Sequence, residues 1–230
     1  MKQIPLPITF DARPSFESFV PGPNQAALQH LSRLRLPSPP VYLWGPPGSG
    51  KTHLLEALAH RCQESGLQVG WFDPVTATPW VVDERWSLVI VDRCEELGAA
   101  AQQSAFELFV LAGNGVQWAA AGRLPPVDLP LREDLRTRLG WGHVFALHPL
   151  SEAETRAALR RQAEERGIFL SDEVMDHVLT RQSRDLGNLM GLLDRLDRFS
   201  LARSRPITIP LLRRMLQEED VEFGALGVTP

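Results

Sequence analysis

The sequence is poor in lysine and has no basic block. Of its 24 basic side chains only Lys2 and Lys51 are lysines, and residues 1–150 and residues 151–230 each carry 12 basic and 14 acidic groups. A cationic nucleic-acid module would concentrate basic residues in one part of the chain. The even balance therefore predicts little or no direct DNA binding.

Long apolar runs and paired cysteines are also missing. No apolar run approaches the ~18 residues that a membrane helix needs, and the first residues carry no signal-peptide pattern. We therefore expect a cytoplasmic protein that makes no membrane contact. The two cysteines, Cys62 and Cys94, match no metal-ligand or redox spacing, which predicts two small buried apolar side chains.

What the chain does contain is an alternation of apolar runs and helical patterns. Its 230 residues, 43% hydrophobic and 23% charged, are enough for one to two globular domains. Strands are predicted at residues 41–44, 68–72, 88–91 and 116–121, and helices at residues 25–35, 52–64 and 99–111. We expect Asn24 to cap the first of these helices. The alternation predicts an α/β domain: a parallel sheet with helices on both faces.

From residue 151 the pattern becomes purely helical. Ser151 and Glu154 form a capping-box pattern that begins a helix to residue 166. Further helices are predicted from residue 171, at 185–201 and at 211–217, with an extended segment at 206–210 between the last two. We therefore expect four parts: an extended tail at 1–10, an α/β domain at 11–150, a small all-helical domain at 151–218 and a flexible acidic tail at 219–230.

A phosphate-binding loop is the clearest motif in the chain. The pattern G-x-x-x-x-G-K-[ST], between a strand and a helix, is satisfied by Gly45-Pro46-Pro47-Gly48-Ser49-Gly50-Lys51-Thr52. Its glycines let backbone N–H groups face phosphate oxygens, and the helix N-terminus adds partial positive charge. Lys51 would reach the β- and γ-phosphates, and the Thr52 hydroxyl would ligate Mg²⁺. The loop, with the adjoining His53, predicts a site for ADP or ATP with Mg²⁺.

The second expected part of such a site is an acidic residue after a buried strand. Asp92 follows the apolar run at 88–91 and is placed to hold Mg²⁺ through water. At the next position, where an active ATPase of this class has a carboxylate that orients water, the chain has Arg93. A cation cannot accept a proton from water, and Glu95 and Glu96 are expected to project differently. Efficient ATP hydrolysis by the chain alone is therefore not expected.

The segment before the loop carries a family resemblance. Residues 15–24, Ser-Phe-Glu-Ser-Phe-Val-Pro-Gly-Pro-Asn, resemble the F-x-x-F-V-x-G-x-N segment that precedes the ATPase core of the bacterial replication initiator DnaA and its short relatives. The resemblance spans about residues 16–217. It implies the AAA+ class, in which a P-loop α/β core is followed by a helical lid. It also implies that Phe19 and Val20 contact adenine; a hydrophobic strap over the core is the alternative for each residue.

A second resemblance lies at the N-terminus. A peptide similar to the Q-L-x-L-x-[LF] motif, which binds the bacterial sliding clamp, is formed by Gln3-Ile4-Pro5-Leu6-Pro7-Ile8. An extended peptide stiffened by proline loses little entropy on docking, although the same six residues could form an edge strand. With an initiator-like core, the motif resembles the Hda family of regulatory inactivators. The DNA-reading domain and the N-terminal partner-binding domain of full-length initiators are expected to be missing.

The Hda resemblance implies an arginine that acts on a neighbouring subunit. Residues 134–139, followed by Gly-Trp-Gly, resemble the arginine-finger segment, so Arg138 is the candidate finger and a solvated helix face is the alternative. Two departures concern nucleotide sensing. The polar sensor after the fourth strand is replaced by Ala-Gly-Arg ending at Arg123, and the lid arginine aligns with Gly187, with Arg184 as a candidate substitute. These departures predict weak hydrolysis and weak discrimination between ADP and ATP.

Together these features predict a nucleotide-bound adaptor. It would bind the DNA polymerase III sliding clamp at the replisome and stimulate ATP hydrolysis by DnaA, preventing over-initiation of chromosome replication. Two other interpretations stay open: an autonomous AAA+ ATPase of the helicase-loader type, and a DnaA-like DNA-binding paralogue with a cationic face. The preferred nucleotide and the oligomeric state stay open too, including association of the chain with itself.

Overall fold

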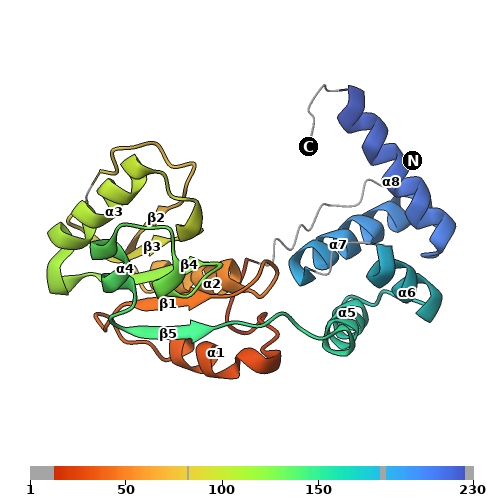
Figure 1. Cartoon of the computed structure of the whole chain (residues 1–230). Helices are drawn as coiled ribbons and strands as arrows, with labels where there is room; N and C mark the ends of the chain where they lie inside the picture. Colours follow the sequence, from red (N-terminus) through yellow and green to blue (C-terminus); the bar gives the residue numbers. More distant parts are fainter. Residues whose placement is uncertain (1–12, 82, 182–184, 226–230) are drawn as a thin grey trace. The chain divides into compact units, whose positions relative to one another are not determined.

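The chain folds into two compact units. The computed structural model describes residues 13–81, 83–181 and 185–225 (Figure 1). Apart from Pro47–Ser49, which group with the second unit, the boundary between the units falls between His148 and Pro149. In these described ranges no helix is both long enough and apolar enough to cross a membrane.

The first unit is built on a five-stranded parallel sheet with the strand order β2-β3-β4-β1-β5. The strands are β1 (Val41–Trp44), β2 (Gln68–Phe72), β3 (Trp86–Val91), β4 (Gln117–Gly122) and β5 (His143–Ala146). Residue 41 pairs with residue 119 of β4 on one side and residue 143 of β5 on the other, so β1 is internal. Strands covered on both faces are apolar throughout, which is why the inner strands read as continuous hydrophobic runs.

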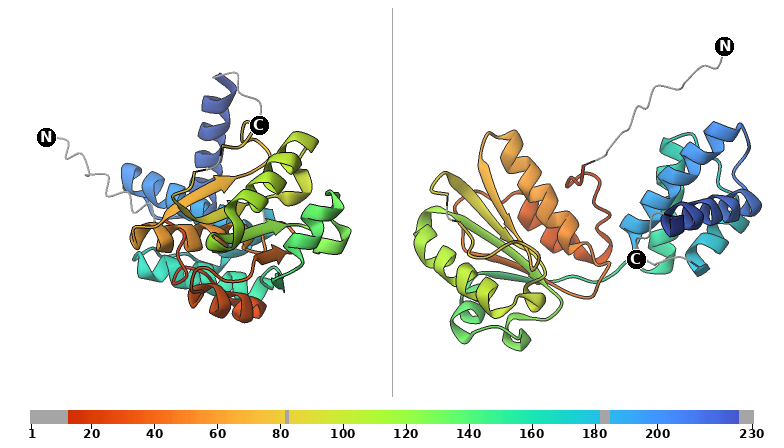
Figure 2. Two further views of the ribbon diagram at one scale, coloured as in Figure 1. Left: turned by 90° about the vertical axis from the view of Figure 1, so that its left-hand side faces the viewer. Right: turned by 90° about the horizontal axis from the view of Figure 1, so that it is seen from above.

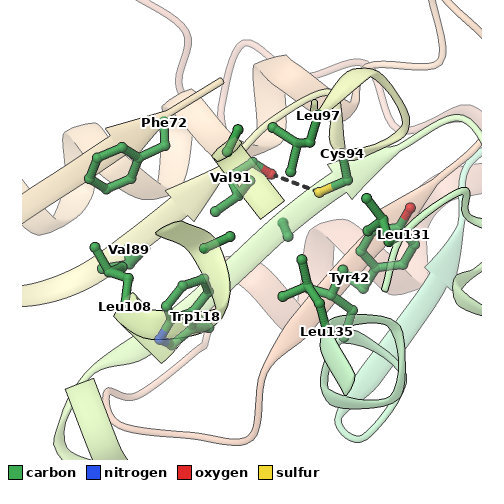
Figure 3. Packing of buried hydrophobic residues seen from close by; sticks show 14 of the residues in the cluster. Tyr42, Phe72, Val89, Val91, Cys94, Leu97, Leu108, Trp118, Leu131 and Leu135 are labelled. Atoms are coloured by element: carbon green, nitrogen blue, oxygen red, sulfur yellow. Dashed lines mark hydrogen bonds between the residues drawn. The ribbon is translucent and has the colours of Figure 1, made fainter. Parts of the chain in front are cut away.

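Helices cover both faces of this sheet, as predicted. Helices α1 (Gln25–Ser32) and α2 (Lys51–Glu64) pack on one face, and α3 (Ala99–Ala112) and α4 (Glu133–Leu139) on the other (Figure 2, right). Side chains alternate between the faces along each strand, so Tyr42 lies in the α3 and α4 layer and Leu43 in the α1 and α2 layer. The sheet therefore has two hydrophobic layers, one of which is drawn in Figure 3.

Both cysteines are buried and free, in agreement with the sequence prediction. Cys94 begins the short 3-10 helix η2 (Cys94–Glu96), and its Sγ lies 3.5 Å from the Val91 carbonyl oxygen (Figure 3). Three further 3-10 helices occur among the described residues: η1 (Gly22–Asn24), η3 (Gly113–Gly115) and η4 (Pro126–Asp128). Burial raises the pKa of the Cys94 thiol well above its ordinary value, so the thiol stays protonated and packs as a small apolar group.

The second unit is all-helical. It contains α5 (Glu152–Glu165), α6 (Asp172–Arg181), α7 (Leu186–Arg203) and α8 (Ile209–Ala225). The capping box at the start of α5 is present: the Ser151 hydroxyl accepts from the Glu154 N–H, and the Ser151 N–H donates to Glu154 Oε2 at 2.8 Å. Leucine and methionine side chains of all four helices meet in one apolar core.

Three sequence predictions need correction. Asn24 makes no capping bond to α1; it is buried, and its side-chain amide exchanges two 2.8 Å hydrogen bonds with the backbone of His148. Helix α1 ends at Ser32 rather than at residue 35, because the Arg61 guanidinium donates to the carbonyls of Leu31, Ser32 and Leu34. The edge strand β5 was not predicted; it is only four residues long, and three of its four side chains are exposed.

The end of the chain also differs from the prediction. Helix α8 begins at Ile209, inside the segment expected to be extended, and continues to Ala225, through residues expected to form a flexible tail. Pro210 is tolerated in the first turn, where its missing N–H would have no intrahelical partner. Leu211, Leu212 and Met215 bury their side chains, which holds the start of α8 on the second unit.

Candidate functional site

The phosphate loop lies at the carboxyl end of the sheet, where ligands bind in open parallel α/β folds. It joins β1 to the N-terminus of α2, and its first N–H, from Gly45, donates to the Gly122 carbonyl at the end of β4 over 3.2 Å. Gly48 and Gly50 have φ angles of 75° and 89°. Residues with side chains rarely adopt this left-handed backbone, so the glycines of the motif meet a conformational need.

The phosphate loop ends with Lys51 and Thr52, and Asp92 lies next to Thr52. Lys51 Nζ donates to the carbonyl oxygens of Gly45 and Pro46 at 2.7 and 2.8 Å. The Thr52 hydroxyl donates to Asp92 Oδ2 at 2.7 Å, and Asp92, at the end of β3, is 6% exposed. Two elements that are separate in the sequence, the loop and the end of β3, thus place a hydroxyl and a carboxylate side by side.

This pair fits a magnesium ion. Mg²⁺ prefers hard oxygen ligands and is commonly held by one or two protein groups together with phosphate oxygens and water. A hydroxyl and a carboxylate oxygen in direct contact, next to a phosphate loop, supply such a pair. The other carboxylate oxygen, Asp92 Oδ1, accepts from the Arg93 N–H at 2.9 Å, which fixes the orientation of the group.

Phe19 and His53 lie beside the loop. A Cβ built on Gly50 would stand 2.5 Å from Phe19 Cε2, so the buried Phe19 ring rests on the loop backbone. The rings of Phe19 and His53 are 5.4 Å apart between centroids. His53 Nε2 also lies 2.9 Å from the Ser15 carbonyl oxygen, and Val20 is half-buried. The structure therefore places Phe19 and His53 together at the loop. The contact of Phe19 and Val20 with adenine stays a prediction.

Residues 13–20 form a strap along α2, and the sequence did not predict its anchors. The Ser15 and Ser18 side chains each accept from the backbone N–H of the other, at 3.2 and 3.0 Å. His60 Nδ1 lies 2.9 Å from the Pro14 carbonyl oxygen, and the Arg61 guanidinium lies over the Phe16 ring. A signal was available: the histidines at positions 53 and 60 are seven residues apart, on one side of the same helix.

Arg93 is held by ion pairs. Its backbone is left-handed, with φ of 54°, and its guanidinium lies 2.8 Å from Asp73 and 3.6 Å from Glu96. Burial alone would raise the pKa of Asp73, but hydrogen bonds from Thr76 and Arg93 outweigh burial and lower it. The position next to Asp92 therefore holds an ion-paired cation.

Arg123 is paired as well. Its Nε lies 3.0 Å from Glu95, and another guanidinium nitrogen lies 2.9 Å from Glu96. The Glu95 side chain, 12% exposed, also accepts from the Arg123 backbone N–H at 3.0 Å. Glu95 and Glu96 are thus engaged by arginines, and their expected distance from an attacking water stays a prediction.

Arg138 lies on α4 and is half-buried. Its guanidinium lies over the rings of Phe106 and Phe109 of α3, 5.3 and 5.1 Å from their centroids. Cation–π contacts of this kind restrict a guanidinium without neutralising it. Arg138 is therefore a held side chain rather than part of a fully solvated helix face. Its action on a neighbouring subunit stays a prediction.

Two groups of predicted site residues need separate mention. The proposed clamp-binding residues Gln3 to Ile8 and the candidate lid arginine Arg184 lie outside the described residues. Gly187, where a lid arginine was expected, is the exposed second residue of α7. The Asp185 side chain caps this helix by accepting from the Asn188 N–H at 3.0 Å.

Comparisons with known proteins agree on the class of fold. Residues 152–216 match the family model described as the Hda lid domain. Domain III of the replication initiation protein DnaA from Thermotoga maritima superposes with a TM-score of 0.69 at 21% identity, covering 93% of this chain and 98% of that one. AMPPCP-bound DnaA from Aquifex aeolicus gives 0.67 at 19% identity, covering 91% and 70%. A RuvB mutant from Thermotoga maritima gives 0.60 at 18% identity, covering 89% and 73%. At these identities the structural likeness establishes the fold.

Proposed function

We propose that the chain is an AAA+ protein related to Hda and to DnaA, and that it is a nucleotide-bound adaptor that makes the initiator hydrolyse its ATP. In this proposal the N-terminal peptide holds the chain on the sliding clamp of DNA polymerase III. Arg138 then completes the active site of an ATP-bound DnaA subunit. The conversion of DnaA to its ADP form limits new rounds of chromosome replication.

The bound nucleotide has a structural role in this account. The loop N–H groups and Lys51 hold the phosphates, and Thr52 and Asp92 hold the Mg²⁺ that neutralises them. AMPPCP is bound by the DnaA structures with the same fold, which supports an adenine nucleotide here. Phe19, which belongs to the strap, rests on Gly50 of the loop. In this proposal a change of the loop on nucleotide binding moves the strap, which leads to the clamp-binding tail.

The observation that carries the proposal is Arg93. A complete phosphate loop and its aspartate are followed by a cation whose guanidinium is paired with Asp73 and Glu96. Hydrolysis needs a group that accepts the proton of the attacking water, and a guanidinium has donors only and cannot do so. Nucleotide binding without efficient turnover fits an adaptor better than an autonomous motor of the helicase-loader type.

Arg138 supplies a cation for the γ-phosphate of the ATP bound to DnaA. A guanidinium placed against a γ-phosphate neutralises the charge that develops in the transition state, which raises rates about 10³–10⁵-fold where such fingers act. The rings of Phe106 and Phe109 limit the orientations of Arg138, so less freedom is lost when it enters a partner's site. Tethering to the clamp would raise the local concentration of the finger, so moderate affinities suffice.

A comparison of two arginines on α4 tests the proposal. Arg138→Ala is expected to abolish stimulation of ATP hydrolysis by DnaA in the presence of DNA-loaded clamp. Arg136→Ala removes the same charge from the same helix and is expected to retain it. Equal stimulation by the wild type and Arg138→Ala would contradict the proposal. Appreciable ATP turnover by the chain alone would favour the autonomous motor.

The clamp contact is tested separately. Gln3→Ala combined with Leu6→Ala is expected to eliminate retention of the chain on immobilised clamp, because it removes the amide and one apolar anchor of the peptide. The Arg138→Ala protein should be retained like the wild type. Failure of the wild type to bind the clamp would refute this half of the proposal.

A further inference from the structure

Arg138 lies near the end of a very short helix. Helix α4 spans only seven residues, and an isolated helix of this length is unstable in water. Its N-cap residue, Arg132, makes no side-chain capping bond. Leu135 and Leu139 bury their side chains, but apolar contacts are non-directional and fix the position of a helix only loosely. The placement of Arg138 therefore depends on the directional contacts that hold the start of α4.

Gln102 of α3 supplies contacts of this kind. Its Oε1 accepts from the backbone N–H of Arg132 at 3.0 Å. Its Nε2 donates to the Leu97 carbonyl oxygen at 2.8 Å and, more weakly, to the Pro130 carbonyl oxygen at 3.4 Å. A side-chain amide carries both donors and an acceptor, so it can serve all three backbone groups at once. One half-buried side chain thus joins the residues before α4 to the residue before α3 begins.

The Leu97 contact belongs to the segment that leaves the candidate nucleotide site. Asp92 follows β3, η2 comes next, and Leu97 directly follows η2. Leu97, Leu131 and Leu135 lie in one hydrophobic layer, which is drawn in Figure 3. Gln102 therefore ties the start of α4 to a part of the chain that is anchored in the core of the first unit.

The neighbouring Gln103 contacts the same residue in a different way. Its Oε1 accepts from the guanidinium of Arg132, which also donates to Asp134 at 2.7 Å. Gln103 and Arg132 are both exposed, so water competes for this contact. The Gln103 bond ends on a side chain, whereas the Gln102 bond ends on the backbone and so sets the path of the chain into α4.

We propose that Gln102 is a positioning residue for Arg138. By holding the Arg132 backbone against Leu97, it fixes the start of α4 and hence the point at which the finger enters the partner's site. A displaced finger slows the step that it promotes, while the surface that docks on the partner is retained. This inference rests on the role of Arg138 in the proposed function; in it Gln102 itself touches neither the nucleotide nor the partner.

Gln102→Met tests the inference, because methionine has a similar length without the amide donors or acceptor. The rate of ATP hydrolysis by DnaA is measured against the concentration of this chain in the presence of DNA-loaded clamp. The maximal stimulated rate is expected to fall about tenfold, while the half-saturating concentration stays within about twofold of the wild type. Gln103→Met, on the same helix, should keep both values. Adding Gln102→Met to Arg138→Ala should cause no further loss, because no finger is left to position.

The outcomes separate this inference from the proposed function. If Arg138→Ala stimulates like the wild type, the proposed function fails. If Arg138→Ala loses stimulation but Gln102→Met keeps the wild-type maximal rate, only the inference is overturned. A change confined to the half-saturating concentration, or an equal loss in Gln103→Met, overturns it too. If Gln102→Met does not fold, as judged by thermal melting, Gln102→Glu takes its place under the same criteria, since it loses both donors and keeps the acceptor.

Discussion

At the scale of single residues, Gly50 couples the phosphate loop to the strap. Its φ of 89° is left-handed, and a Cβ there would stand 2.5 Å from the Phe19 ring. We expect Gly50→Ala to lower the free energy of unfolding by about 2–4 kcal/mol, because backbone strain adds to displacement of a buried ring. Urea denaturation measures the loss.

Gly66 provides a matched control for that prediction. Its φ is 77°, also left-handed, but a Cβ there would meet nothing within 4 Å. Gly66→Ala is therefore expected to lose only about 1–2 kcal/mol, the share due to the backbone. Equal losses in the two variants would mean that Phe19 does not constrain the loop.

His30 predicts a specific response to acid. Its Nε2 is buried with no hydrogen-bond partner among the described residues, and its ring lies 4.3 Å from that of His143 between centroids. Burial, and secondly the neighbouring His143, lower the pKa of His30 from 6.5. As the pH falls below 6.5, the unfolded chain takes up a proton more readily than the folded one, so stability decreases.

Replacing His30 should therefore flatten the acid side of the stability profile. Between pH 7.5 and pH 5, His30→Gln is expected to lose less unfolding free energy than the wild type, measured by urea denaturation at each pH. Parallel profiles for the two proteins would show that His30 does not contribute to the acid response.

Single residues also mark how far the site could be read from sequence. The phosphate loop is contiguous, so its eight residues and their backbone needs were predictable. The pairing of Arg93 with Asp73 was not, because it depends on β2 and β3 being neighbours in the sheet. The hold of Glu95 and Glu96 on Arg123 similarly depends on the order of β3 and β4.

At the scale of elements, Asn24 joins the start of α1 to the end of β5. Its buried amide exchanges two hydrogen bonds with the His148 backbone. Asn24→Ala is expected to destabilise the protein by about 1–2 kcal/mol, because it removes two part-buried hydrogen bonds to the backbone of the exposed residue His148. Gln29→Ala, exposed on α1, should change stability by less than about 0.5 kcal/mol in the same urea titration.

Elements with strong local patterns were predicted, and those that depend on distant partners were not. The inner strands, α2, α3 and the capping box of α5 follow from apolar runs and caps that are visible in the sequence. Asn24 was predicted to cap α1 from its position before the helix. Its hydrogen-bond partner, His148, lies 124 residues away in the sequence and gives no local signal. The edge strand β5 gains its order from pairing with β1 rather than from its own composition.

At the scale of the whole molecule, charge and fold together favour an adaptor. The chain has the fold of DnaA domain III, and residues 152–216 match the Hda lid family model, yet its basic residues are spread evenly over both parts of the sequence. An even distribution of this kind is the reason to propose that contact with DNA is made through the clamp. We propose above all that this chain acts on ATP held by another protein.

The most direct test measures which of the two proteins hydrolyses its bound ATP, by placing labelled ATP on one protein at a time. DnaA is loaded with labelled ATP, this chain with unlabelled ADP, and the two are mixed with DNA-loaded clamp in a single-turnover reaction. The account predicts that labelled ATP on DnaA is converted to ADP much faster with the wild type than with Arg138→Ala, which should match the rate of DnaA alone. Unaccelerated conversion with the wild type, together with hydrolysis of labelled ATP when it is loaded on this chain instead, would contradict the account.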